Sequence, residues 1–121
     1  MQQFDIGNWV TQLRKGLLEL CVVLQLSKGE VYAYDLVKRL AGVKSLAITE
    51  GTVYPILSRL KSAGLLSSRL EESPSGPARK YYALTPEGRA AMELMRLYWG
   101  GLVVSIEQLM EGEEDDQNVD S

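Results

Sequence analysis

The sequence predicts a mainly α-helical protein with one small β-hairpin. Three segments with helical hydrophobic spacing lie in the first half of the chain, and a fourth occupies the C-terminal third. Between the third and the fourth, two short runs flank a loop of proline, glycine and serine, which is typical of a hairpin. With 121 residues, 45% of them apolar, the chain is long enough for one compact domain.

The first helix is predicted to begin at a cap, Asp5 or Asn8, and to end near Leu26, before Lys28 and Gly29. Its apolar residues recur every three or four positions and form an unusually wide face. A face of this width needs more than one neighbour. Its central stripe comprises Trp9, Leu13, Leu17, Leu20 and Leu24, and is widened by Val10, Cys21 and Val22.

The second helix is predicted from about residue 34 to residue 41, with Lys38 and Arg39 outward. Its inward positions are Leu36, Val37 and Leu40. A short connection, residues 42–47, leads into the third helix. Three helices joined by links this short form a helix-turn-helix arrangement.

The third helix is predicted to begin at Thr49 or Glu50 and to end at Gly64. Its inward face carries Val53, Ile56, Leu57 and Leu60. Pro55 lies beyond the first turn if Thr49 is the cap, so we expect a kink or a later start. The opposite face is small and hydroxylic, and comprises Gly51, Pro55, Ser58 and Ser62, flanked by Tyr54 and Arg59.

This outer face predicts a surface that approaches another molecule closely, because an ordinary solvated helix face would carry more glutamate and lysine. Our first hypothesis is that the third helix lies in the major groove of DNA. The net charge of the whole chain is −3, but residues 28–80 hold nine basic and five acidic residues. Binding to a polyanion depends on such local charge.

The hairpin is predicted from two runs, residues 65–71 and 79–84, around a loop at residues 73–77. The two prolines of this loop are expected to stiffen it and to exclude ladder pairing there. A hairpin that follows a helix-turn-helix makes a winged helix. Near the wing tip, the side chains predicted to contact phosphates are Arg69, Arg79 and Lys80. The alternative for this cluster is a solvated hairpin.

The last helix is predicted to start with Thr85 as N-cap, Pro86 in the first position and Glu87 in the first turn. Its apolar seam has heptad spacing and comprises Met92, Met95, Trp99, Leu102, Ile106 and Leu109. Only an acidic tail follows, so we expect no later segment to cover this seam. The first helix can cover part of it, and we predict that a second copy covers the rest.

Gly100 and Gly101 lie beside Trp99 in this helix, where each costs about 1 kcal/mol relative to alanine. Two interpretations stay open. The glycines let a partner helix approach closely, or they leave a gap in which Trp99 stacks on a flat apolar ligand. For the second interpretation, the predicted ligand-binding residues are Trp99, Met92, Met95 and Leu102.

Composition argues against several function classes. The chain has no histidine and one cysteine, Cys21, so a common general base, a Cys/His metal cluster and an internal disulfide are excluded. We expect Cys21 to be a buried small hydrophobe in a reducing cytosol. No signal peptide or membrane-spanning run is present. Glu71 and Glu72 form a carboxylate pair, and we expect no pocket around them. We therefore predict no enzyme, no cofactor and no metal site.

Three segments resemble the PadR family of bacterial transcription regulators: Tyr-Ala-Tyr-Asp-Leu at residues 32–36, and residues 51–60 and 76–88. Ala33 departs from the family pattern, which has glycine there. The likeness covers about residues 10–110. It implies a dimeric winged-helix repressor of the short subgroup, with an interface built from the first and last helices. In some members it also implies a tryptophan, here Trp99, facing its symmetry mate across a pore for aromatic compounds.

We therefore predict a cytoplasmic, homodimeric repressor that binds double-stranded operator DNA and that a planar aromatic or hydrophobic effector releases. Its predicted parts are a winged helix-turn-helix (1–84), a dimerisation helix (85–111) and a disordered acidic tail (112–121). The predicted DNA contacts are Lys38, Thr52, Tyr54, Pro55, Ser58, Arg59, Lys61, Gly76, Arg79 and Lys80. The predicted dimer contacts are Leu13, Leu17, Leu20, Met92, Met95, Trp99, Leu102, Ile106 and Leu109. The alternative is a winged-helix module that binds protein and not DNA.

Overall fold

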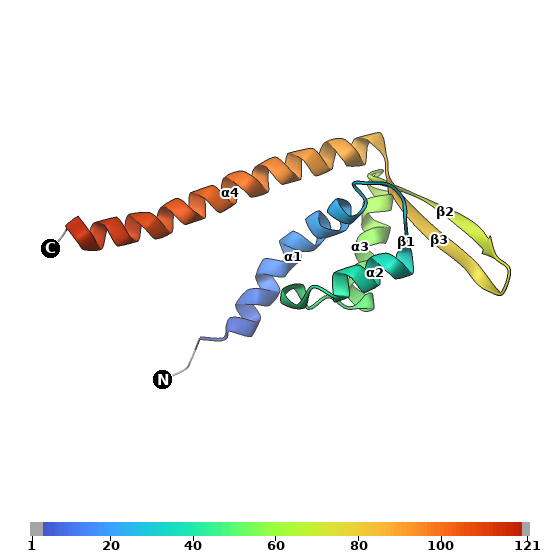
Figure 1. Cartoon of the computed structure of the whole chain (residues 1–121), viewed down its shortest axis with the longest axis horizontal. Helices are drawn as coiled ribbons and strands as arrows, with labels where there is room; N and C mark the ends of the chain where they lie inside the picture. The colour runs from blue at the N-terminus through green and yellow to red at the C-terminus, as the bar shows by residue number, and fades with distance from the viewer. Residues whose placement is uncertain (1–3, 120–121) are drawn as a thin grey trace.

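The computed structural model confirms a mainly α-helical fold with a small β-hairpin (Figure 1). It describes the backbone of residues 4–119 and the side chains of residues 4–112. The elements within these residues are α1 (Ile6–Gln25), β1 (Val31–Tyr32), α2 (Ala33–Ala41), the 3-10 turn η1 (Lys44–Leu46), α3 (Glu50–Ser62), β2 (Leu66–Ser73), β3 (Gly76–Leu84) and α4 (Pro86–Val119). Helices α1 to α3 and the hairpin form the predicted winged helix.

One hydrophobic core joins α1, α2 and α3. The predicted apolar faces of α2 and α3 turn into it, and Leu36 and Leu57 are fully buried. One part of the wide apolar face of α1 is buried in the core, and another part is exposed to solvent. Its buried residues are Leu18, Leu20, Val22 and Val23. Trp9 and Leu13, predicted in the central stripe, are 51% and 46% exposed. The described residues therefore leave the part of this face that carries Trp9 and Leu13 uncovered.

α3 continues through Pro55, so the predicted later start is wrong. Proline lacks an N–H, which leaves the carbonyl of Gly51, four residues earlier, without its helical donor. Both residues are exposed, so water can reach that carbonyl. The helix ends at the predicted glycine. Gly64 is left-handed (φ 80°), and the Leu65 N–H donates to the Leu60 carbonyl at 3.0 Å to close the last turn.

The sheet has three antiparallel strands in the order β1-β3-β2. The sequence pattern does not predict β1, because two residues show no alternation. The ladder of β2 and β3 pairs Glu71 with Arg79 and then shifts, so that Ser73 faces Gly76. The expectation that the loop excludes ladder pairing is therefore wrong for Gly76, although Pro77 has no partner in this register.

Thr85 caps α4 as predicted, because its Oγ1 accepts a hydrogen bond from the Gly88 N–H at 2.9 Å. The helix reaches Val119, past the predicted end at residue 111. Disorder of residues 112–121 stays a prediction, and residues 120–121 lie outside the described part of the chain. Glutamate and glutamine favour helix, and extending a formed helix costs far less than nucleating one.

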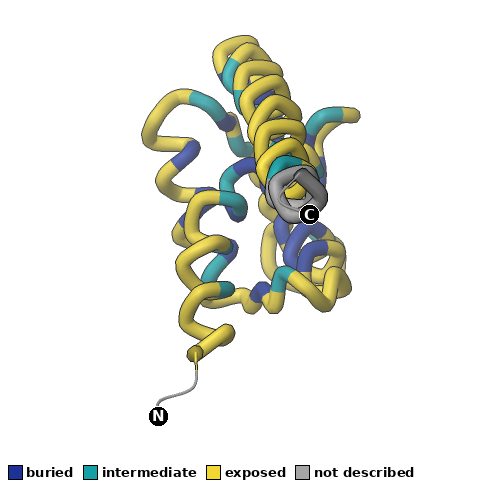
Figure 2. Tube along the Cα trace, turned by 90° about the vertical axis from the view of Figure 1, so that its left-hand side faces the viewer, coloured by how far each residue is buried: buried dark blue, intermediate teal, exposed yellow. Residues whose placement is uncertain are grey.

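The N-terminal end of α4 lies against the rest of the molecule, and the remainder of the helix projects away from the other elements (Figure 1). Its first turns pack on the core through Met92, which is buried, and Met95, which is half-buried. Most of the described helix beyond them is exposed (Figure 2). The large apolar side chains exposed on α4 include Leu94, Leu97, Tyr98, Leu109 and Met110. α4 therefore carries apolar surface that its own chain leaves in water.

Gly88 is required by the close approach of α4 to the segment that follows α3. A Cβ at this position would lie 1.9 Å from the Leu65 carbonyl oxygen. We predict that Gly88→Ala lowers the Tm by several degrees, because overpacking costs about 1–3 kcal/mol. Thermal unfolding followed by circular dichroism measures this. Gly112→Ala lies in the same helix with no neighbour within 4 Å and should leave the Tm unchanged or raised. Equal Tm values for the two variants would contradict the packing argument.

Candidate nucleic-acid interface and the adjoining groove

The buried inner face of α3 fixes the orientation of its outer face. Val53 and Leu57 on its inner face are fully buried, which sets the rotation of the helix about its axis. Four outer positions predicted to contact DNA are exposed as a result: Tyr54, Pro55, Ser58 and Lys61. Thr52 is half-buried, with its hydroxyl 3.2 Å from that of Thr49. Small side chains around Ser58 leave room for a partner to approach the helix closely.

Arg59 lies on the flank of α3 that faces α1. Its Nε donates to the Glu19 carboxylate at 2.8 Å, and its Nη2 contacts the same oxygen. This edge of the guanidinium, which is suited to bidentate contact with a base, is therefore engaged within the protein. The two side chains are 59% and 34% exposed, and exposed ion pairs are worth at most about 1 kcal/mol. A base contact by Arg59 must compete with Glu19.

Three tyrosines from β1, α2 and β3 form what we call the tyrosine row: Tyr34, Tyr32 and Tyr81. The Tyr32 ring lies 6.1 Å from that of Tyr34 and 5.6 Å from that of Tyr81. Lys38 and Arg79 lie over this row, each 5.3 Å from a ring centroid. Cation–π contact holds both cations in place without neutralising them. The structure thus unites two predicted DNA contacts from distant parts of the chain. The sequence pattern does not predict this row, because Tyr32 and Tyr81 meet only through the pairing of β1 with β3.

Arg79 and Lys80 do not form one patch. Successive strand residues point to opposite faces of a sheet, and Lys80 lies 5.4 Å from the ring of Tyr82, which is buried on the core side. Gly76 is exposed at the start of β3. The expectation of one basic cluster near the wing tip is therefore wrong. Arg69 and Arg79 instead lie on one face of the wing, and Lys80 lies on the other.

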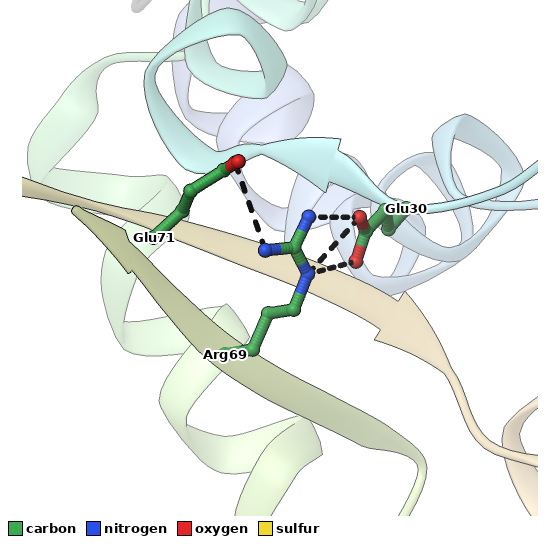
Figure 3. Close-up of polar contacts among 3 residues, drawn as sticks. All are labelled: Glu30, Arg69 and Glu71. Carbon is green, nitrogen blue, oxygen red and sulfur yellow. Dashed lines mark hydrogen bonds and ion pairs between the residues drawn. The ribbon is translucent and has the colours of Figure 1, made fainter. Parts of the chain in front are cut away.

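Arg69 ties the wing to the turn before β1 (Figure 3). Its Nε donates to the two carboxylate oxygens of Glu30 at 3.1 and 2.9 Å, and its Nη1 lies 3.6 Å from Glu71. The guanidinium also lies 4.6 Å from the centroid of the Tyr81 ring. Hydrogen bonding by Arg69 lowers the pKa of Glu30, and the same bond raises the pKa of Arg69. Arg69 is therefore engaged by two carboxylates and is not a free cation for a phosphate.

A groove of about 680 Å³ lies between α1 and α4. Its walls are Leu13, Gly16, Leu17, Glu19, Leu20, Leu94, Met95, Tyr98, Trp99 and Leu102. Three of the four residues predicted to bind a ligand are among them. Met92 is the exception, because it is buried in the core and does not line the groove. Its assignment as a ligand contact stays a prediction, and this groove does not support it.

The glycine pair of α4 does not make this groove. Gly16 of α1 is the glycine in its wall, whereas Gly100 and Gly101 are not among the lining residues. A Cβ at either position of the pair would meet nothing within 4 Å. Close approach of a partner helix at the pair stays a prediction. The interpretation that the pair leaves a gap between helices beside Trp99 concerns a partner helix, and it also stays a prediction.

The predicted dimer contacts divide into covered and uncovered residues. The exposed ones are Leu13, Trp99, Leu102, Ile106 and Leu109. Leu17 and Met95 are half-buried and line the groove. Leu20 and Met92 are buried within the chain, so little of their surface is left for a partner. These two residues are buried because the first turns of α4 pack against the core.

The described residues contain no group of three side chains able to hold a metal ion. No helix among them is both long and apolar enough to cross a membrane. Burial raises the pKa of Cys21, which disfavours the reactive thiolate. The pKa of Tyr54 is also raised, first by burial and then by Glu50, so its phenol stays a neutral donor at the surface of α3.

The fold and this surface define a winged-helix protein. Basic side chains lie over tyrosine rings beside its third helix. The model of the Transcriptional regulator PadR-like family matches residues 22–94, and the chain belongs to this family. A PadR-like transcription factor from Bacteroides fragilis is 40% identical, with a TM-score of 0.71 over 84% of this chain and 98% of that one. A PadR family regulator from Eggerthella lenta is 36% identical, with a TM-score of 0.76 over 88% and 92%.

A more distant structure, Bacillus subtilis PadR in complex with operator DNA, shares the fold. It is 23% identical, with a TM-score of 0.56 over 64% of this chain and 46% of that one. The family consists of transcriptional regulators, which confirms the predicted PadR resemblance and the prediction that the chain is not an enzyme.

Replacing Arg69 with methionine should return the pKa of Glu30 to its ordinary value. The folded-state pKa of Glu30 is lowered, so the pair stabilises the fold above the unfolded pKa, and this is lost as pH falls through the folded pKa. A carboxyl ¹³C NMR titration measures the shift. Arg96→Met, which breaks the Arg96–Glu93 pair on α4, is the control. A Glu30 titration unaffected by Arg69→Met would show that the two do not pair in solution.

Proposed function

We propose that this PadR-like regulator is a homodimeric repressor that binds operator DNA through α3 and the wing. One observation carries the proposal. The outer face of α3 is small and exposed around Ser58, while Lys38 and Arg79 are held over the tyrosine row. A helix with such a face fits the major groove of DNA, and basic side chains beside the helix contact the DNA phosphates. The operator complex of Bacillus subtilis PadR, which shares the fold, supports this proposal.

The proposed contacts have three roles. The base-reading residues are Thr52, Tyr54, Pro55 and Ser58. The phosphate contacts are Lys38, Lys61, Arg79 and Lys80. Gly76 lets the backbone of the wing approach the duplex. Arg59 takes part when it leaves Glu19. Such a regulator acts in the cytoplasm, where bacterial DNA lies.

Dimerisation through α1 and α4 belongs to the proposal. The exposed apolar side chains of α4, together with Trp9 and Leu13 of α1, form the kind of surface that partners cover. Covering it gains about 25 cal/mol for each Å² removed from water. A twofold dimer that serves one DNA duplex places its two α3 helices about 34–36 Å apart, one turn of B-DNA. The operator is then pseudo-palindromic.

The groove is the proposed effector site. Its volume of about 680 Å³ suits a small molecule. Trp99 offers a stacking surface, and Met95 and Leu102 offer adaptable apolar walls. We propose that a planar aromatic or hydrophobic molecule binds there and releases the repressor from its operator.

A second candidate function is a protein-interaction module that does not bind DNA. One observation favours it, because Arg59 and Arg69 are engaged by glutamates and are not free for phosphates. Salt dependence separates the two functions. Phosphate contacts release counterions, so DNA binding weakens as salt rises, whereas a largely apolar protein interface does not.

Fluorescence anisotropy with the DNA upstream of the protein's own gene, at about 50 and 200 mM salt, tests the repressor function. We expect binding that falls steeply with salt. Arg79→Ala should weaken it and lower the salt slope by about one unit, because one phosphate contact is lost. Arg96→Ala removes the same charge from α4 and should change neither. Binding insensitive to salt, or none to any sequence in a genome-wide selection, would favour the interaction module.

Trp99→Ala should abolish quenching of the protein's fluorescence by a planar aromatic compound such as 9-anthracenemethanol. The reason is that Trp99 lines the groove and would stack on such a ligand. Trp9→Phe is the matched control and should retain the quenching. Quenching that persists without Trp99 and disappears without Trp9 would place the ligand outside the groove.

A further inference from the structure

Glu19 lies where the groove meets α3. Among the described residues that line the groove, it is the one with a charged side chain. Its carboxylate accepts the hydrogen bond from the Arg59 Nε at 2.8 Å and also contacts Nη2. One carboxylate therefore borders the proposed effector site and holds an arginine of the helix proposed to read DNA.

We propose that Glu19 is a positioning residue that couples the groove to DNA binding, because it competes with the operator for Arg59. This inference rests on the proposed function. The pair is solvent-exposed, so Arg59 can leave Glu19 for DNA at little cost. The position of α3 does not depend on the pair, because Val53 and Leu57 anchor that helix in the core.

An apolar molecule in the groove shifts this competition. Aromatic surface placed against Glu19 excludes water from its carboxylate. An ion pair strengthens as the local dielectric falls, and a carboxylate left unpaired there costs more than one in water. Arg59 then stays on Glu19, and its contact with DNA is lost. Occupation of the groove thereby lowers operator affinity without any movement of α3.

Glu19→Gln tests the competition, because glutamine keeps the size of the side chain and loses its charge. We expect the affinity for DNA to rise by up to about fivefold, which corresponds to the most that an exposed pair is worth. Glu93→Gln removes the same charge from α4, where Glu93 pairs with Arg96, and should change nothing. In an Arg59→Gln background, Glu19→Gln should have no effect on affinity. An unchanged or weaker affinity in a Glu19→Gln protein with the wild-type Tm would overturn the inference.

A neutral probe tests the coupling. 9-Anthracenemethanol should weaken DNA binding by the wild type and leave that of Glu19→Gln unchanged, while it quenches Trp99 equally in both. The same titration with DNA alone controls for intercalation. A merely structural role for Glu19 would not separate probe binding from its effect on DNA. Equal weakening in the two proteins would overturn the coupling.

A direct measurement separates this inference from the proposed function. If the wild type binds no DNA, the proposed function fails, but the pair can still be followed by ¹⁵N NMR of the Arg59 side-chain Nε–H. We expect its resonance to shift in Glu19→Gln, and its exchange with water to slow when the probe fills the groove. A resonance indifferent to both would show that Glu19 does not hold Arg59.

Discussion

The apolar surface that α1 and α4 leave in water constrains the rest of the molecule. α4 extends well beyond the core (Figure 1), and Leu97 and Leu109 on it are 73% and 74% exposed. Trp9 and Leu13 add to this surface from α1. Exposed apolar area of this kind is unfavourable and is normally covered by a partner. In the proposed dimer, this one requirement determines the oligomer, closes the groove and sets the separation of the two α3 helices.

α1 connects that surface to α3, the helix proposed to read DNA, because it uses both of its faces. Val22 packs in the core, Gly16 lines the groove, and Glu19 reaches α3. The cations near α3 accordingly fall into two classes. Lys38 and Arg79 stay available to phosphates, whereas Arg59 and Arg69 are held by carboxylates. In the proposed function, the balance between the two classes, and not the net charge of the chain, governs how this surface binds DNA.

Most of the fold follows from local signals. The Thr85 cap, the Gly64 stop and the spacing of apolar residues in α3 each act within a few residues, so the sequence alone predicts them. β1 exists only through its pairing with β3 and has no period of its own. Periodicity identifies an apolar face but not which neighbour covers it, so the burial of Met92 within the chain could not be foreseen. The pair of Arg59 and Glu19 joins residues 40 positions apart, and no short-range pattern encodes such a contact.

In the proposed dimer, which is built on α1 and α4, both α3 helices face one DNA duplex. Measuring the distance between the two α3 helices tests this claim most directly. A spin label on Ser58→Cys, in a Cys21→Ser background, reports this separation by double electron–electron resonance without DNA. The account predicts one distance distribution centred near 34–36 Å, the spacing of successive major grooves on one face of B-DNA. A monomer without an interspin distance, or a distribution centred far from this value, would contradict it.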